Sequence, residues 1–165
     1  MNSKTKRVVL SSMFAAIICI ATMVFKIPLP LKGYINLGDA AIIAASWCLP
    51  GWYGVAAAAI GSSLADILSG YAVYAPATFV IKAVMSLVLS LASIKTTKNA
   101  KKLLSALAAE VIMVLGYFGF EGVLYGLVVA APNIIPNMIQ GIASIVIGIF
   151  VWKIYEKNIK KGING

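Results

Sequence analysis

Charged residues are scarce in this sequence and histidine is absent. Only 12% of its 165 residues are charged, whereas 61% are hydrophobic. A soluble domain carries about 25% charged residues and about half apolar ones. The 5 acidic and 14 basic residues could not cover the surface of a water-soluble protein of this length. We therefore expect most of the chain to lie in lipid rather than in water.

Motifs that mark enzymes and cofactor sites are also missing. With no histidine, and with only Cys19 and Cys48 in apolar surroundings, the sequence offers neither a zinc or haem site nor a disulfide framework. It contains no Gly-x-Ser-x-Gly motif, no aspartate-rich diphosphate motif and no Walker A sequence. We therefore expect no enzyme, no cofactor and no bound metal, and any use of ATP would need another subunit.

Eleven of the 14 basic residues form three clusters, and each cluster flanks a hydrophobic segment. They lie within residues 4–7, 95–102 and 153–161. Because the cytoplasmic ends of membrane-spanning helices are enriched in Lys and Arg, this pattern predicts three cytoplasmic positions. The net charge of +9 is then explained by membrane topology, with some affinity for anionic lipid, and not by binding to nucleic acid.

Turn-forming residues divide the chain into six apolar segments. A helix needs about 20 apolar residues to cross a bilayer, so the length leaves room for five or six spans. Six spans from a cytoplasmic N-terminus place every basic cluster in the cytoplasm. The sequence therefore predicts an all-α membrane protein, one domain over residues 1–165, built as a compact bundle of six transmembrane helices (N-in/C-in). The predicted spans are 8–25, 37–49, 52–69, 77–94, 103–131 and a sixth that ends near Trp152.

Two neighbouring segments differ from ordinary spans and loops. The segment 37–49 is short, which predicts a tilted, buried or partly re-entrant course. The connection before it, residues 26–36, contains two prolines and a glycine and is the longest outer connection. We expect this connection to act as a lid over a site in the outer half of the bundle.

Ionisable residues inside apolar segments are costly, and by default they mark a functional site or a buried partner. Here they are Asp39, Asp66, Lys82, Glu110 and Glu121. All except Glu110 fall in the outer half of their predicted spans, and Glu110 falls in the inner half without an assigned role. Further polar residues share helix faces with them at steps of three or four, so we expect these stripes to converge inside the bundle.

Two interpretations of these stripes remain open. In the first, Asp66 and Lys82 pair with each other across a tight loop, and amide side chains hold helices together. In the second, the stripes form a binding site. A carboxylate and amides flanked by tyrosines suit a small ring-bearing polar molecule. The residues in question are Glu121, Asn137 and Gln140, with Tyr74, Tyr117 and Tyr125.

Small residues recur every four positions along the first predicted span. Ser11, Ala15 and Cys19 form a strip that would let another helix approach closely, with Ser12 and Ala16 beside it. From the spacing alone, packing inside the same bundle is the simpler explanation.

Four short motifs, in their order along nearly the whole chain, resemble those of a known family. They are Tyr34-Ile-Asn-Leu-Gly-Asp39, Gly61-Ser-Ser-Leu-Ala-Asp66, Tyr74-Ala-Pro-Ala-Thr-Phe-Val-Ile-Lys82 and Pro136-Asn-Met-Ile-Gln140. The sequence resembles the substrate-binding S component of an energy-coupling factor (ECF) vitamin transporter, and the number of spans and the basic inner ends agree. Within the family it is similar to the hydroxymethylpyrimidine or pyridoxine branch, because the riboflavin branch typically has an Asp-Leu-Ser-Asp-like motif at this entry.

The resemblance implies a multi-pass protein of the bacterial cell membrane that captures a vitamin or its precursor outside the cell. Its partners would be an ECF transmembrane coupling subunit and two ATPase subunits. The strip Ser11, Ala15 and Cys19 resembles the Ala-x-x-x-Ala coupling surface of the family, although only its middle position is alanine. The expected substrate-binding residues are Asn36, Asp39, Tyr74, Lys82, Tyr117, Glu121, Tyr125, Asn137 and Gln140.

Two alternatives to this function stay open. One is an S component for riboflavin or another vitamin. The other is a self-sufficient small membrane transporter or channel, with the same bundle and polar stripes but without ATPase partners.

Overall fold

A computed structural model of the chain describes residues 3–28, 34–49, 51–95 and 99–164, of which 3, 93–95 and 158–164 are described by their backbone alone. Six main helices follow one another along the sequence. A two-stranded hairpin separates the first two, and a short helical turn precedes the last. The helices are α1 (Ser3–Val24), α2 (Gly38–Cys48), α3 (Trp52–Leu68), α4 (Ala75–Lys95), α5 (Asn99–Tyr125), α6 (Leu127–Ala130) with a 3-10 turn (Ala131–Asn133), and α7 (Ile134–Asn164).

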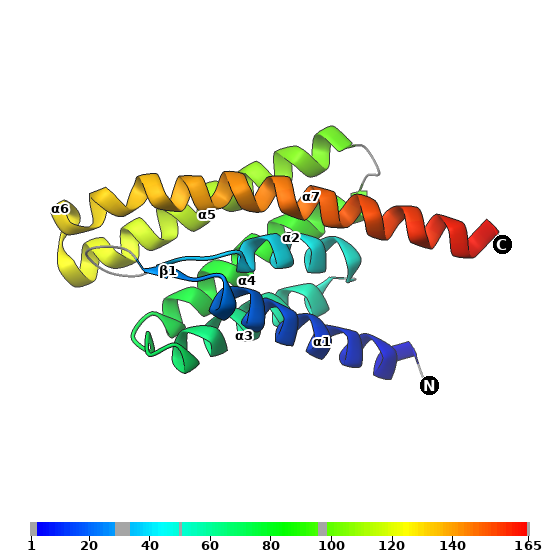
Figure 1. The fold of residues 1–165 in the computed structure, drawn as a ribbon, viewed down its shortest axis with the longest axis horizontal. Coiled ribbons are helices and arrows are strands. Elements are labelled where there is room, and N and C mark those ends of the chain that lie inside the picture. The colour runs from blue at the N-terminus through cyan, green and yellow to red at the C-terminus, as the bar shows by residue number, and fades with distance from the viewer. Residues whose placement is uncertain (1–2, 29–33, 50, 96–98, 165) are drawn as a thin grey trace.

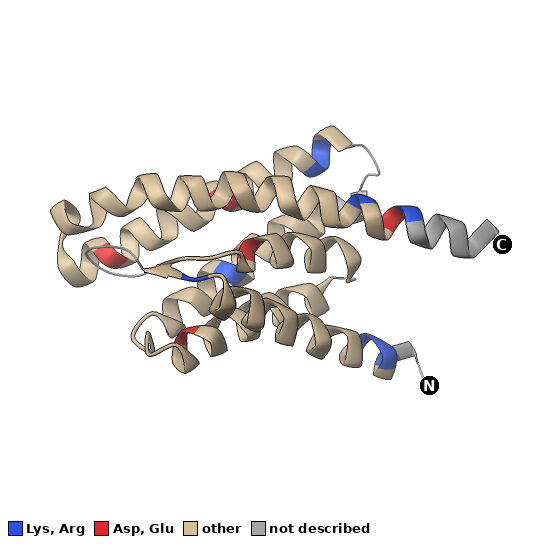
Figure 2. Cartoon of the chain, in the orientation of Figure 1, with Lys and Arg blue, Asp and Glu red and all other residues tan. Residues whose placement is uncertain are grey.

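The main helices run roughly along the long axis of the molecule (Figure 1). Both termini, the end of α4 and the start of α5 lie at one end, which we call the termini end. The hairpin, α6 and the turn between α3 and α4 lie at the opposite end, the hairpin end. Figure 2 shows Lys and Arg gathered at the termini end, whereas other basic positions lie beside the hairpin and in the middle of the bundle. This arrangement places the described parts of the three basic clusters together.

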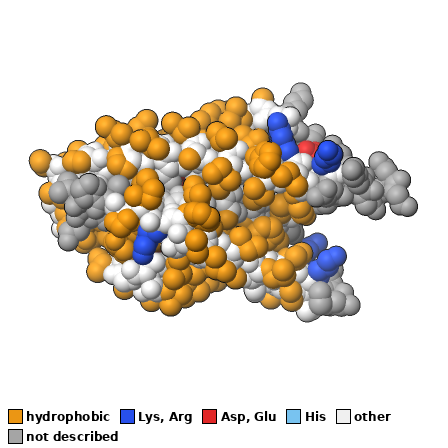
Figure 3. Space-filling model, viewed as in Figure 1, with side chains coloured by type: hydrophobic (Ala, Val, Ile, Leu, Met, Phe, Trp, Pro, Cys, Tyr) orange, Lys and Arg blue, Asp and Glu red, His pale blue; other side chains and the backbone are white. Residues whose placement is uncertain are grey.

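Within the part of the chain that the structure describes, four helical segments are long and apolar enough to cross a membrane. They are Lys4–Val24, Ala75–Ala92, Asn99–Tyr125 and Leu127–Lys157, and the shorter apolar helix α3 lies beside them. Large apolar side chains cover the outside of the bundle (Figure 3), as expected for a surface that faces lipid. The polar stripes, in contrast, are buried, so the prediction that they converge inside the bundle is confirmed.

Helix α2 explains the short second segment. Its 11 residues span about 16 Å, far less than the roughly 30 Å of a bilayer core. Nine of these residues are buried, because α1, α3, α4 and α7 all pack around the helix. Of the three courses that the sequence left open, the structure shows the buried one. The helix therefore carries its acidic residue, Asp39, into the middle of the protein.

Two expectations about the chain path were wrong in detail. The fifth helix does not continue to residue 131. It ends at Tyr125, because Gly126 adopts a φ of +89°, and α6 then reverses the chain. The connection 26–36 contains two short strands, β1 (Ile27–Pro28) and β2 (Tyr34–Ile35), which pair antiparallel. Residues 29–33 of the expected lid lie outside the described residues.

Cysteine labelling tests the predicted topology. In a variant lacking Cys19 and Cys48, a single cysteine is placed either at the termini end (Asn99→Cys) or at the exposed Val73 between α3 and α4. Because basic clusters resist translocation, we expect a membrane-impermeant maleimide to label Val73→Cys in intact cells and Asn99→Cys only after permeabilisation. The reverse pattern would invert the topology and with it the side from which the site is reached.

Candidate functional site

The centre of the bundle holds a buried ion pair between α2 and α4. The Lys82 ammonium donates to Asp39 Oδ1 at 2.5 Å, and both side chains are almost fully buried. The second oxygen, Asp39 Oδ2, accepts from Gln140 Nε2 of α7, also at 2.5 Å. The pairing of Lys82 with Asp66 in the first interpretation of the stripes is therefore wrong. Lys82 pairs instead with Asp39, because packing of α2 against α4 brings its carboxylate to the ammonium.

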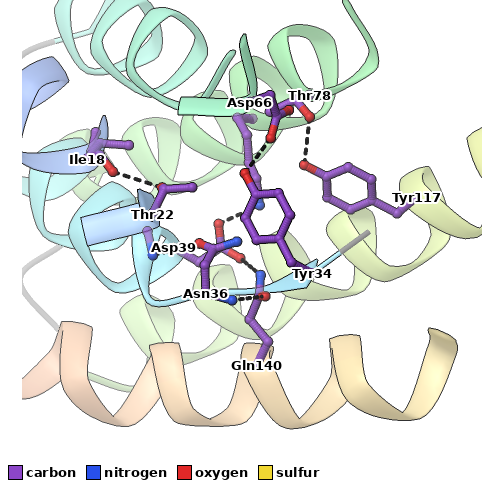
Figure 4. Close-up of polar contacts among 11 residues, drawn as sticks. Ile18, Thr22, Tyr34, Asn36, Asp39, Asp66, Thr78, Tyr117 and Gln140 are labelled. Atoms are coloured by element: carbon purple, nitrogen blue, oxygen red, sulfur yellow. Dashed lines mark hydrogen bonds and ion pairs between the residues drawn. The ribbon is translucent and has the colours of Figure 1, made fainter. Parts of the chain in front are cut away.

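Gln140 also ties the hairpin to the bundle (Figure 4). The backbone N–H of Asn36 donates to Gln140 Oε1 at 2.7 Å. The Asn36 side-chain oxygen accepts from the backbone N–H of Gly38 at 2.8 Å, so it holds the first turn of α2. One amide side chain thus connects the Asp39–Lys82 pair to the segment that follows β2.

A second contact fastens β2 to α3. The Tyr34 hydroxyl donates to Asp66 Oδ1, and the Tyr34 ring packs at 4.8 Å from the ring of Tyr71 in the turn after α3. Burial, reinforced by the neighbouring Asp66 carboxylate, raises the pKa of the Tyr34 hydroxyl. The phenol therefore stays protonated and acts as the donor. Lys26, at the start of the hairpin connection, lies 5.4 Å from the centre of each of these two rings.

The remaining carboxylate of the hairpin end, Glu121 of α5, is held by two donors. The Tyr74 hydroxyl donates to its Oε1 at 3.2 Å, and Asn133 Nδ2 donates to its Oε2 at 2.8 Å. One helical turn away, the Tyr117 hydroxyl bonds to Thr78 Oγ1 at 3.0 Å. The ring of Tyr117 also faces the Lys82 ammonium, which lies 5.3 Å from the ring centre. Tyr74 therefore contacts the acidic side chain of Glu121 on α5, and Tyr117 on α5 contacts the basic side chain of Lys82.

These side chains surround one cavity of about 30 Å³, which has room for water but not for a ring. Its wall combines carboxylates, a lysine, amides, hydroxyls and tyrosine rings from five helices and the hairpin. A ligand with a ring would need the wall to open around it. The lining residues are Thr22, Tyr34, Asn36, Ser62, Asp66, Tyr74, Thr78, Lys82, Tyr117, Glu121, Asn137 and Gln140.

Seven of the nine residues expected to bind substrate line this cavity, and two do not. Asp39 lies directly behind the wall, bonded to Lys82 and Gln140. Tyr125 is half-buried and interacts electrostatically with Tyr74, but it does not reach the cavity. The seven are Asn36, Tyr74, Lys82, Tyr117, Glu121, Asn137 and Gln140.

Five further lining residues were missing from that set. Ser62, Asp66 and Thr78 belong to the polar stripes of α3 and α4, so helical spacing could have found them. Tyr34 carried no periodic signal, since it reaches the cavity from a two-residue strand. Thr22 lies near the end of α1 and donates to the backbone oxygen of Ile18 in its own helix, and nothing in the sequence set it apart.

Glu110 is separate from this cavity. Its side chain is buried against Gly141 of α7, and neither of its carboxyl oxygens has a hydrogen-bond partner among the described residues. A Cβ at position 141 would lie 3.1 Å from Glu110 Cβ, so a glycine at this position makes room for the acidic side chain. Glu110 stays without an assigned role.

The small-residue strip on α1 faces α3. Ser11 donates from its Oγ to the backbone oxygen of Tyr53 at 2.7 Å. Ala15 packs against Gly61, where a Cβ would come within 2.5 Å of the Ala15 oxygen. Part of the strip therefore serves internal packing, as its spacing alone indicated. Beside it, Ser12 and Ala16 are exposed and border an open groove of about 350 Å³ between the two helices.

A helical bundle that is apolar outside and has a polar cavity inside is the architecture of a multi-pass membrane protein. Comparison with known proteins identifies its family. Residues 2–157 match the family model described as "ECF-type riboflavin transporter, S component". The chain belongs to the family of ECF-type transporter S components. Such proteins are binding subunits of transporters and not enzymes, and the family implies ECF transporter partners and a small-molecule substrate.

Individual proteins are also similar to this chain. A Pyrococcus woesei protein, described as an uncharacterized protein in the gap 3′ region, is 33% identical over 143 residues, which cover 86% of this chain and 96% of that protein. A solved structure of the S component of a bacterial ECF transporter superimposes with a TM-score of 0.79 at 20% identity. The superposition covers 96% of this chain and 99% of the other, so it shows that the fold is shared.

Proposed function

We propose that this protein captures a one-ring vitamin or vitamin precursor, of the hydroxymethylpyrimidine or pyridoxine type, for ATP-driven uptake. The ligand would enter from outside the cell, and an ECF transmembrane coupling subunit with two ATPase subunits would drive its release inside. The observation that carries this proposal is the polar cavity, which is enclosed in an otherwise apolar bundle and lined by both donors and acceptors.

The cavity wall suits the chemistry of such rings. The carboxylates of Glu121 and Asp66 can accept from amino or hydroxyl substituents, while Lys82, Asn137 and Gln140 can donate to ring nitrogens and hydroxymethyl oxygens. Tyr74 and Tyr117 offer aromatic faces for the ring itself. Because buried polar groups are left unpaired when a ligand lacks its own, a site of this kind discriminates sharply between related rings.

Riboflavin is the second candidate, and the description of the matching family model favours it. Its three fused rings and ribityl chain need much more room than a single six-membered ring. A cavity of about 30 Å³ must widen for either ligand, but far less for the smaller one. A one-ring ligand therefore requires the smaller rearrangement of the cavity wall.

Calorimetry on the purified protein in detergent tests this choice. Hydroxymethylpyrimidine, pyridoxine and riboflavin are titrated separately, and native mass spectrometry of the untreated protein looks for a ligand that co-purifies. We expect one of the single-ring compounds to bind most tightly, with binding weakened by Asn137→Ala. Tighter binding of riboflavin would replace the proposed substrate. No co-purification with ATPase subunits in a pull-down from cell membranes would favour a self-sufficient transporter.

The strip on α1 is the proposed surface for the coupling subunit, and a bulky residue there tests it. Ala15→Trp is expected to abolish uptake while substrate binding persists, because the indole would block the approach of another helix. Since Ala15 also packs against Gly61, the exposed Ala16 provides a second variant, Ala16→Trp, that fills the same groove without that contact. Ile20→Trp, on the exposed side of α1, is the control and should transport normally. Loss of binding in Ala16→Trp would show that the groove serves internal packing.

A further inference from the structure

A second groove lies at the termini end, between α2, α5 and α7. Its volume is about 250 Å³, and among the described residues it shares no lining residue with the ligand cavity. Trp47 of α2, Lys102 and Leu103 of α5, and Trp152 and Lys153 of α7 contribute to its wall. The proposed function makes no use of this groove.

The groove contains a buried cation between two indole rings. Lys102 is only 7% exposed, and its ammonium lies 3.3 Å from the centre of the Trp152 ring and 5.4 Å from that of Trp47. The two rings meet edge to face at 6.0 Å. An indole N–H can only donate a hydrogen bond and so needs an acceptor. Both indole N–H groups are nevertheless buried without an acceptor among the described residues. This combination favours a ligand that is negatively charged and rich in hydrogen-bond acceptors.

The surroundings of the groove are basic on one side and apolar on the other. Lys101, Lys153 and Lys157 are exposed, and Glu156 interacts electrostatically with Lys102. Figure 2 shows basic positions gathered at this end. Leu103, 42% exposed, continues the groove onto the apolar outer surface of the bundle. A free anion would match only the basic side, whereas an amphipathic anion matches both.

We propose that this groove binds the headgroup of an anionic phospholipid. Lys102 and Lys153 would hold its phosphate, and its acyl chains would lie along the exposed apolar residues of α5 and α7. Tryptophans commonly lie at the level of the lipid headgroups in membrane proteins, which agrees with the two indoles at this end of the bundle. The inference does not depend on which vitamin the ligand cavity takes.

Tryptophan fluorescence provides a direct test. The chain has 3 tryptophans, and Trp52, which is 73% exposed, lies outside the groove. In a Trp52→Phe protein the emission therefore reports on Trp47 and Trp152 alone. We expect short-chain phosphatidylglycerol, added in detergent, to change this emission saturably, and short-chain phosphatidylcholine to leave it unchanged. An equal response to both lipids would overturn the proposal, as would displacement of phosphatidylglycerol by millimolar inorganic phosphate, which would indicate a site for soluble anions.

Removing single charges distinguishes lipid binding in the groove from general attraction of the lipid to the basic termini end. Lys153→Gln should weaken phosphatidylglycerol binding about fivefold, the factor that corresponds to one lysine near an anionic lipid surface. Lys6→Gln removes an exposed charge at the same end of the molecule but outside the groove, and it should leave binding unchanged. Equal weakening by both variants would mean that the lipid is attracted by net charge and has no defined site.

Discussion

Glu121→Gln is expected to weaken binding of the substrate tenfold or more. Losing a hydrogen bond to a charged group costs about 1.5–3 kcal/mol, and about 1.4 kcal/mol corresponds to a factor of ten in affinity. The structure adds a second reason. Both oxygens of Glu121 already accept, from Tyr74 and from Asn133, and an amide nitrogen in place of one oxygen could not accept from either donor. The variant therefore disturbs the wall of the cavity as well as its charge.

Calorimetry with the ligand identified for the wild-type protein measures this effect. Glu156→Gln is the matched control, because it makes the same chemical change near the termini end, away from the cavity. Asn137→Ala removes an amide from the same wall and should also weaken binding. If Glu121→Gln and Asn137→Ala both bind as tightly as the wild type, these residues only hold helices together and the substrate binds elsewhere.

Lys82→Met is expected to have the largest effect on stability. Removing one partner of a buried ion pair leaves the other charge uncompensated, which costs about 3–5 kcal/mol. Among the described residues, the Asp39 carboxylate would then keep only Gln140 as a side-chain donor, in a helix that is buried on nearly every side. Thermal unfolding of the purified protein in detergent should show a large fall in the midpoint.

A second substitution distinguishes charge from packing. Adding Asp39→Asn to Lys82→Met removes the uncompensated charge, and the asparagine oxygen can still accept from Gln140. Stability should therefore largely return in the double variant, whereas ligand binding should not, since Lys82 itself lines the cavity. Lys153→Met, at an exposed position, should change stability little. A double variant as unstable as Lys82→Met would show that the lysine stem, and not the pairing, stabilises the bundle.

The sequence by itself determined the class of the protein and most of the cavity wall. Scarce charge and long apolar segments require a membrane bundle, because lipid cannot solvate exposed polar groups. For the same reason, polar residues spaced by three or four on α4, α5 and α7 had to face inward, and six of them line one cavity. Local spacing sufficed for these features because each depends on a single helix and its solvent.

Only the tertiary structure decided which side chains pair. Helical spacing gives the face on which Lys82 lies but not the neighbour that it meets, so Asp66 and Asp39 were equally compatible with the sequence. Because the short helix α2 packs against α4 and α7, Asp39 contacts Lys82 and Gln140. Asp66 instead accepts a hydrogen bond from Tyr34. The contribution of Tyr34 was equally hidden, because it depends on where the hairpin folds back over the bundle. These contacts join residues more than 30 positions apart, and their geometry is set by how the helices pack and not by any local pattern.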